Sequence, residues 1–138
     1  MHERKRECNQ GSESMAAVLI CDNEARLRAV LKLYAQLEGH EVTEAENGLE
    51  AVEACKVNSF DIIIIDVAIP GYDGFSAVEE IRKTSNVPII ILTVRDTEYD
   101  KKRGFELGIA DYIVKPFSSK EIMLRISTIL KRTDSSLA

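Results

Sequence analysis

Short apolar runs alternate with amphipathic stretches along the chain from Ala16 onward. Five of these runs have the length of β-strands, and they cover residues 17–21, 42–45, 61–66, 87–92 and 112–114. The run 61–66 reads Asp-Ile-Ile-Ile-Ile-Asp, and uniform β-branching is typical of a central strand that is covered on both faces. The pattern therefore predicts strands buried inside a sheet.

Between the strands, apolar residues recur at three- and four-residue spacing, which predicts one buried face for each of a series of helices. The clearest example follows the first strand and ends at Gly39, and its apolar positions are Leu27, Val30, Leu31, Tyr34 and Leu37. Further helices are expected over residues 49–55, 75–83 and 98–107. The last helix should begin at the capping-box pattern Ser118-Ser-Lys-Glu121 and continue to about residue 130.

Strict alternation of strand and helix predicts an α/β fold, with an open parallel sheet and helices on both of its faces. The 138 residues have the size of one domain. We expect this domain to span residues 16–132. Residues 1–15 should form a flexible N-terminal tail, and residues 133–138 should fray as a C-terminal tail or linker stub.

Composition and charge narrow the possible functions. The formal charge of −5 argues against a basic face that would bind nucleic acid directly. The three cysteines form no C-x-x-C pair, so neither a disulfide framework nor a zinc site is indicated, and a reducing, cytoplasmic setting is the simplest interpretation. No apolar stretch reaches the length of a membrane span, and residues 1–14 lack the apolar core of a secretory signal.

Polar side chains follow four of the predicted strands. They are Asp22, Asn23 and Glu24 after the first strand, Asp66 after the third, Thr93 after the fourth, and Lys115 with Pro116 after the fifth. Because ligands of open parallel sheets bind beyond the carboxyl ends of the strands, we expect these side chains to meet at one edge. Each residue alone is more simply explained as a helix cap or turn residue, but their joint occurrence indicates a site.

The residue types at this edge suit phosphoryl transfer. Carboxylate and amide oxygens are suitable ligands for Mg²⁺, and a carboxylate such as Asp66 can attack a phosphoryl donor to form an acyl phosphate. The Lys115 ammonium and the Thr93 hydroxyl would then contact the phosphoryl oxygens.

Over residues 17 to about 132 the sequence resembles the receiver domains of bacterial two-component response regulators. The segment 61–74 is similar to the phosphoacceptor loop of that family, with Asp66 as the acceptor and the Ala68 backbone carbonyl as a metal ligand. Thr93 matches the switch hydroxyl, Tyr112 the switch aromatic residue, and Asp-Tyr-Ile-Val-Lys115-Pro-Phe the lysine segment of the family.

The resemblance implies a flavodoxin-like, doubly wound (βα)5 fold with strand order 2-1-3-4-5. It also implies a histidine kinase as phosphodonor, Mg²⁺ as cofactor, and a signalling switch rather than an enzyme, with only slow self-catalysed dephosphorylation. Phosphorylation of Asp66 is expected to draw Thr93 and Lys115 inward and to let Tyr112 rotate toward the interior. The surface of the fourth helix and fifth strand would change as a result.

One position departs from the family pattern. Two adjacent acids usually follow the first strand, whereas this chain has Asp22 and then Asn23, so the metal site carries one negative charge fewer. We therefore expect the set Asp22, Asn23, Asp66 and Ala68 to bind Mg²⁺ weakly, with Asp22 and also Glu24 taking more of the role. An alternative is an atypical receiver that acts as a protein-interaction module without phosphorylation.

Residues 93–132 are similar to the subfamily in which a winged-helix (OmpR/PhoB-like) DNA-binding domain follows the receiver. This resemblance implies a homodimer on activation and DNA contact only through an output domain that is not in this chain. The expected dimer face comprises Lys101, Phe105, Asp111, Glu121 and Arg125. The same charges are equally compatible with an ordinary solvated surface.

A second alternative is an enzyme or a flavin carrier on the same type of sheet, because a fold does not dictate function. Two features argue against it. No glycine-rich phosphate loop follows the first strand, and Ala68 stands where an aspartate-based phosphatase would need a second acid.

Overall fold

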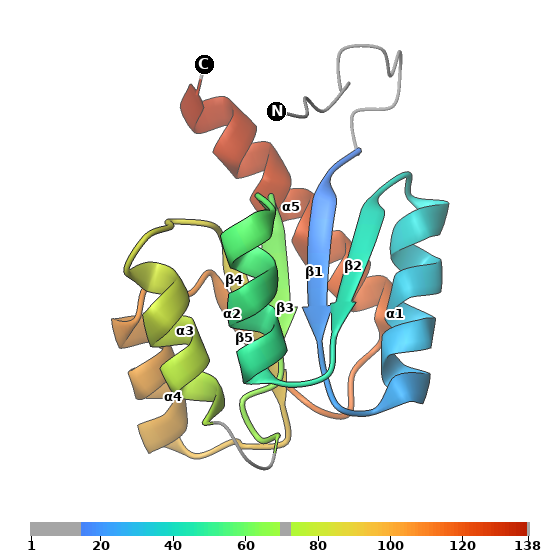
Figure 1. Ribbon diagram of the computed structural model, residues 1–138. Coiled ribbons are helices and arrows are strands. Elements are labelled where there is room, and N and C mark those ends of the chain that lie inside the picture. Colours follow the sequence, from blue (N-terminus) through green and yellow to red (C-terminus); the bar gives the residue numbers. More distant parts are fainter. Residues whose placement is uncertain (1–14, 70–72, 138) are drawn as a thin grey trace.

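The computed structural model describes residues 15–69 and 73–137 and contains a single sheet of five strands flanked by helices (Figure 1). The strands are parallel and follow the order β2-β1-β3-β4-β5, as the family resemblance implied. In chain order the elements are β1 (Ala17–Cys21), α1 (Ala25–Leu37), β2 (Glu41–Ala45), α2 (Gly48–Val57), β3 (Ile62–Ile65), α3 (Gly74–Arg82), β4 (Ile89–Thr93), α4 (Glu98–Glu106), β5 (Asp111–Val114) and α5 (Ser119–Leu137).

The sheet is buried on both faces, and alternate residues of each strand point to opposite layers. One layer packs α2 and α3 on Leu19, Ile63 and Ile91, while the other packs α1 and α5 on Ile20 and Ile64. In Figure 1, α2 and α3 lie in front of the sheet and α5 lies behind it. The four isoleucines of β3 are all buried, which confirms the prediction of a central strand.

Several element boundaries differ from the sequence prediction, and two of these differences have a physical reason in the sequence. Strand β4 begins at Ile89 rather than at residue 87; Pro88, which has no N–H, only accepts a bond from Ile63 through its carbonyl. Helix α5 runs to Leu137, so the residues from Thr133 that were expected to fray are helical. No glycine or proline lies between Ser119 and Leu137 to end the helix.

The N-terminal tail predicted over residues 1–15 lies outside the described residues except for Met15, so the domain boundaries stay predictions. Across residues 15–69 and 73–137, none of the helices is both long and apolar enough to cross a membrane.

Arg82 joins the end of α3 to the end of α4. Its guanidinium donates hydrogen bonds to the carbonyls of Leu107, Gly108 and Ser85 at 3.1, 2.9 and 3.2 Å. Burial lowers the pKa of Arg82, and the carbonyls compensate for the lost hydration. The bonds to Leu107 and Gly108 satisfy backbone oxygens at the end of α4 that have no partner within the helix.

We expect Arg82→Ala to lower the free energy of unfolding by about 2 kcal/mol, because hydrogen bonds from a charged donor contribute about 1.5–3 kcal/mol. Urea denaturation measures this change. Lys83→Ala is the matched control, since its ion pair with Glu80 is exposed and should change stability by less than about 0.5 kcal/mol. Equal effects of the two substitutions would contradict the assigned role of Arg82.

Candidate functional site

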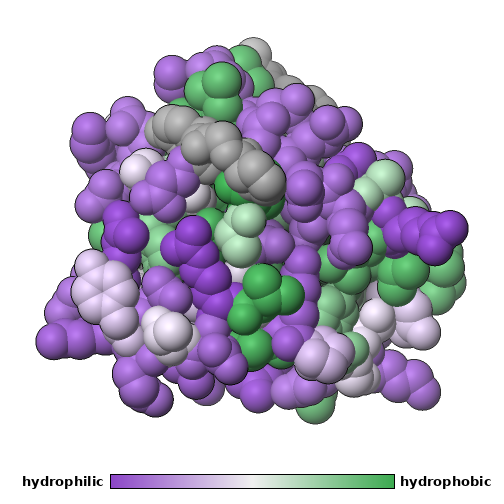
Figure 2. Space-filling view, turned by 90° about the horizontal axis from the view of Figure 1, so that it is seen from below, coloured by the Kyte–Doolittle hydropathy of each residue, from purple (hydrophilic) through white to green (hydrophobic). Residues whose placement is uncertain are grey.

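The carboxyl ends of the strands lie at the lower edge of the sheet in Figure 1, and Figure 2 views that edge from below. Its surface there is mostly hydrophilic, with a few hydrophobic residues among the polar ones. The helix that follows each strand leaves from this edge, so residues at the strand ends project into the loops. The candidate side chains of the sequence analysis come from β1, β3, β4 and β5.

Lys115 connects two carboxylates that are far apart in the sequence. Its Nζ donates to Asp22 Oδ2 and to Asp66 Oδ2, each at 2.9 Å. Both aspartates are buried, at 3% and 6% exposure. Burial lowers the pKa of the Lys115 ammonium, but the hydrogen bonds to Asp22 and Asp66 outweigh this effect and the net shift of its pKa is upward. Lys115 is therefore positively charged when it bridges the two acids.

The second oxygen of each carboxylate is held by the turn that it begins. Asp22 Oδ1 accepts a hydrogen bond from the Glu24 N–H at 2.9 Å, and Asp66 Oδ1 accepts one from the Ala68 N–H at 2.8 Å. This bond to the backbone two residues on is the Asx turn. The two carboxylates are thus fixed at both oxygens, and each faces Lys115 with its Oδ2.

The donor set at this edge is suited to a hard divalent cation. Two carboxylates face one ammonium, so the cluster has a net charge of −1, and the oxygens of Asn23 and of the Ala68 carbonyl lie on the same two turns. Asn23 and Glu24 are exposed. Within the described ranges no three His, Cys, Asp or Glu residues are grouped to hold a metal, so protein ligands for Mg²⁺ would have to include the amide or the carbonyl.

Thr93 and Tyr112 both bind the backbone of Arg95. Thr93 ends β4 and is fully buried, and its Oγ1 accepts the Arg95 N–H at 3.4 Å. The Tyr112 hydroxyl donates to the Arg95 carbonyl at 2.9 Å. Burial is the main reason that the pKa of Tyr112 is raised to about 12, so the hydroxyl remains a donor. The backbone of Arg95, two residues after the end of β4, therefore links Thr93 to the side chain of Tyr112 on β5.

Close packing places α4 directly against Tyr112. A Cβ at Gly104 would lie 3.3 Å from Tyr112 Cδ2 and 2.9 Å from Ile109 Cδ1. The Arg103 guanidinium of α4 also stacks on the Phe75 ring of α3, 4.5 Å from its centroid. A change in the position of Tyr112 would therefore alter its packing against α4.

The residues expected on a dimer face fall into two groups: three charged residues form ion pairs within the chain, whereas Phe105 and Lys101 differ in how exposed they are. Arg125 binds Asp111 and Glu121 of its own chain, and hydrogen bonding to Asp111 is the main reason that the pKa of Arg125 is raised. The sequence did not indicate that these charges pair within one chain. Phe105 is 52% exposed on α4, while Lys101 is half-buried.

Arg28 is a residue near the site that the sequence analysis missed. Its guanidinium is buried and donates to the backbone carbonyl of Asp22 at 2.7 Å. The available signal was its spacing, because Arg28, Leu31 and Ala35 lie three and four residues apart and form the buried face of α1. A charged residue on such a face needs a partner.

Comparisons with known proteins agree with this geometry. Residues 18–127 match the model of the response regulator receiver domain. The chain is 40% identical over 119 residues to the transcriptional regulatory protein ResD of Bacillus subtilis, covering 86% of this chain and 50% of ResD. It is 42% identical over 119 residues to the transcriptional regulatory protein SrrA of Staphylococcus aureus, covering 86% of this chain and 49% of SrrA. The chain thus spans about half the length of these relatives.

Solved structures show the same architecture. The Francisella response regulator 1452 receiver domain superposes with a TM-score of 0.79 at 34% identity, covering 86% of this chain and 98% of that one. The non-phosphorylated HemR receiver domain of Leptospira biflexa superposes with a TM-score of 0.78 at 30% identity, covering 83% and 93% of the two chains.

Proposed function

The chain belongs to the response regulator receiver domain family, and from this premise we propose that a histidine kinase phosphorylates Asp66 of this domain in the cytoplasm. The domain is a signalling switch and not a classical enzyme. The observation that carries the proposal is the contact of Lys115 with both Asp22 and Asp66 at 2.9 Å. This contact brings a buried carboxylate, a second acid and a positive charge together at one edge of the sheet.

In the proposed reaction an Asp66 carboxylate oxygen attacks the phosphorus of a phosphohistidine. A new O–P bond forms, the P–N bond breaks, and the imidazole leaves with its electron pair and is protonated. Asp22, Asn23, Asp66 and the Ala68 carbonyl would hold Mg²⁺, and the bound cation would neutralise charge on the phosphoryl oxygens. Asp22 keeps the Lys115 ammonium beside the reacting group while the Asp66 carboxylate becomes an acyl phosphate, whose charge lies on the phosphoryl oxygens.

The switch proposal uses the shared contact at Arg95. Phosphorylation adds oxygens that attract the Thr93 hydroxyl and the Lys115 ammonium. Movement of Thr93 would shift the Arg95 backbone, to which the Tyr112 hydroxyl is bonded, and Tyr112 packs against Gly104 of α4. We propose that this change controls a homodimer through α4, β5 and α5, and through it a DNA-binding output domain that regulates transcription.

The test is intact mass spectrometry after incubation with phosphoramidate and Mg²⁺. A gain of one phosphoryl group supports the proposal. The exposed Asn23, in place of an acid, favours the alternative of an interaction module that is not phosphorylated. No gain in mass with a small phosphodonor, under conditions in which another receiver domain is labelled, would decide for that alternative.

Asn23→Asp should tighten Mg²⁺ binding by about tenfold, which corresponds to about 1.4 kcal/mol. The substitution restores a negative charge next to the cation, and like charges already present reduce the gain. Isothermal titration calorimetry of the protein with Mg²⁺ measures the change. Asn86→Asp adds the same charge at an exposed loop before β4, on the opposite edge of the sheet, and should leave the affinity unaltered. Equal affinities of the Asn23→Asp and wild-type proteins would remove Asn23 from the ligand set.

A further inference from the structure

Arg28 carries a buried charge that the proposed reaction does not use. The residue is 9% exposed on α1, and a buried guanidinium is costly unless its hydrogen bonds are satisfied. Three groups bind it: the Asp22 carbonyl at 2.7 Å, Glu44 Oε1 at 3.0 Å and Glu46 Oε2 at 3.8 Å. Its partners therefore come from the end of β1 and from the end of β2.

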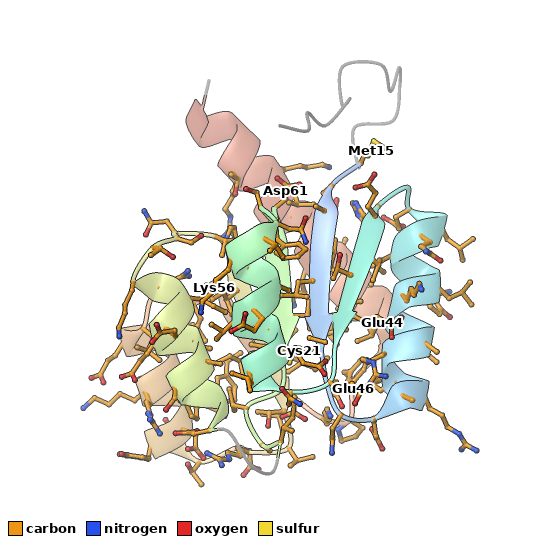
Figure 3. The ribbon with its side chains drawn as sticks, in the orientation of Figure 1. Met15, Cys21, Glu44, Glu46, Lys56 and Asp61 are labelled. Atoms are coloured by element: carbon orange, nitrogen blue, oxygen red, sulfur yellow. The ribbon has the colours of Figure 1, made fainter. Side chains whose placement is uncertain are left out.

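The two carboxylates hold Arg28 in place from the β2 side. Figure 3 shows Glu44 beside the lower part of β2 on the side of α1, Glu46 just beyond the end of the strand, and Cys21 at the end of the neighbouring strand β1. Hydrogen bonding to Arg28 is the main reason that the pKa of Glu44 is lowered, so Glu44 stays ionised. The register confirms the placement, because Cys21 pairs with Ala45, the residue between the two acids.

The contact with Asp22 fixes one particular peptide plane. Arg28 holds the Asp22 carbonyl, and that carbonyl belongs to the peptide unit that joins Asp22 to Asn23. The Asp22 N–H is held independently, by the Ala45 carbonyl at 3.1 Å. With both backbone groups of Asp22 bound, the direction in which the chain leaves β1 toward Asn23 is set.

We infer that Arg28 is a positioning residue that orients the Asp22–Glu24 turn toward the cluster of Asp66 and Lys115, a role that rests on the proposed function. It does not touch the reacting atoms. Its effect is to hold the Asp22 carboxylate and the Asn23 amide where they could bind a divalent cation. Residues that hydrogen-bond to metal ligands orient those ligands in the same way in other metal sites.

Lys32 provides a matched control within the same cluster. Its ammonium binds the other oxygen of Glu44 at 3.2 Å, and its side chain is 40% exposed. Lys32→Met and Arg28→Met each remove one positive charge from α1 and one bond to Glu44. Only Arg28 also binds the Asp22 carbonyl.

The direction of the change in Mg²⁺ affinity distinguishes a positioning role of Arg28 from a simple effect of its charge. Removal of a positive charge near the proposed metal site should by itself favour cation binding, so Lys32→Met is expected to leave the Mg²⁺ affinity unchanged within about twofold or to raise it slightly. Arg28→Met is expected to weaken Mg²⁺ binding by about tenfold, because loss of a residue that supports metal ligands costs roughly 10- to 100-fold. Arg28→Lys keeps the charge but lacks the planar, multi-donor group, and it should also weaken binding.

The experiment combines calorimetric titration with Mg²⁺ alone and hydrogen–deuterium exchange of the metal-free proteins. Faster exchange at the Asn23 and Glu24 amides in both Arg28 variants, with no change in Lys32→Met, is the expected result. Arg28→Lys supplies the measurement if circular dichroism shows that Arg28→Met does not fold.

Two outcomes overturn the inference in distinguishable ways. Wild-type protein that gains a phosphoryl group, together with Arg28 variants that bind Mg²⁺ as tightly as Lys32→Met, would refute positioning and leave the proposed function standing. Wild-type protein that neither binds Mg²⁺ nor gains a phosphoryl group would refute the proposed function, and the role of Arg28 with it.

Discussion

Asp66→Asn is expected to abolish the gain of a phosphoryl group from phosphoramidate and Mg²⁺ while leaving the protein folded. The amide nitrogen and oxygen are not effective nucleophiles, whereas a carboxylate is one. The amide oxygen can still accept the Ala68 N–H that Asp66 Oδ1 binds at 2.8 Å. One buried negative charge is lost, but Lys115 retains Asp22 as its partner at 2.9 Å. The free energy of unfolding should therefore change by no more than about 1 kcal/mol, as measured by urea denaturation.

A control for this substitution lies at the other end of the same strand. Asp61 precedes β3 and accepts the Ala17 N–H at 2.7 Å, and Figure 3 labels it at the upper edge of the sheet, opposite the carboxyl ends of the strands. Asp61→Asn removes the same charge and should be phosphorylated like the wild type. Persistent labelling of the Asp66→Asn protein would mean that another side chain is the acceptor.

The sequence contained enough information for the fold because its signals are local. The isoleucine run of β3 and the helical spacing in α1 depend only on neighbouring residues, and the order of alternating elements leaves few topologies open. The gathering of Asp22, Asp66 and Lys115 followed from the rule on strand ends, and the structure brings the three together. Prediction therefore succeeded wherever position along a strand decides position in space.

Contacts between elements that are brought together only by folding could not be predicted from the sequence in the same way. The pairing of Arg28 with the Asp22 carbonyl needs the register of β1 on β2 and the rotation of α1, neither of which a periodicity analysis supplies. The capping box of α5 is a similar case. Ser118 Oγ accepts the Glu121 N–H at 3.3 Å, but the Glu121 carboxylate binds Arg125. A long side chain can bind any of several partners, and which of them lie within reach is known only from the folded structure.

Gly74→Ala is expected to lower the free energy of unfolding by about 3 kcal/mol, the upper end of the usual range for overpacking. Gly74 begins α3 and is buried, and a Cβ at this position would lie 2.3 Å from Val67 Cα and 2.8 Å from Val67 Cβ. The first of these atoms is backbone, so relief requires movement of the chain itself. Because Val67 directly follows Asp66, the movement should also misplace the acceptor and slow phosphorylation. Urea denaturation and the rate of mass gain measure the two effects.

Gly104→Ala shows why the nature of the neighbouring atom decides the outcome. There the added Cβ would meet Ile109 Cδ1 at 2.9 Å and Ile91 Cδ1 at 3.2 Å, the far ends of flexible side chains that can rotate away. Replacing glycine by alanine within a helix also contributes about 1 kcal/mol of stability, which offsets the crowding. Gly104→Ala should therefore change the free energy of unfolding by less than about 1 kcal/mol. If Gly74→Ala were equally mild, α3 would have to be able to move away from Val67, and the close contact that fixes the loop after Asp66 would not be a constraint on the site.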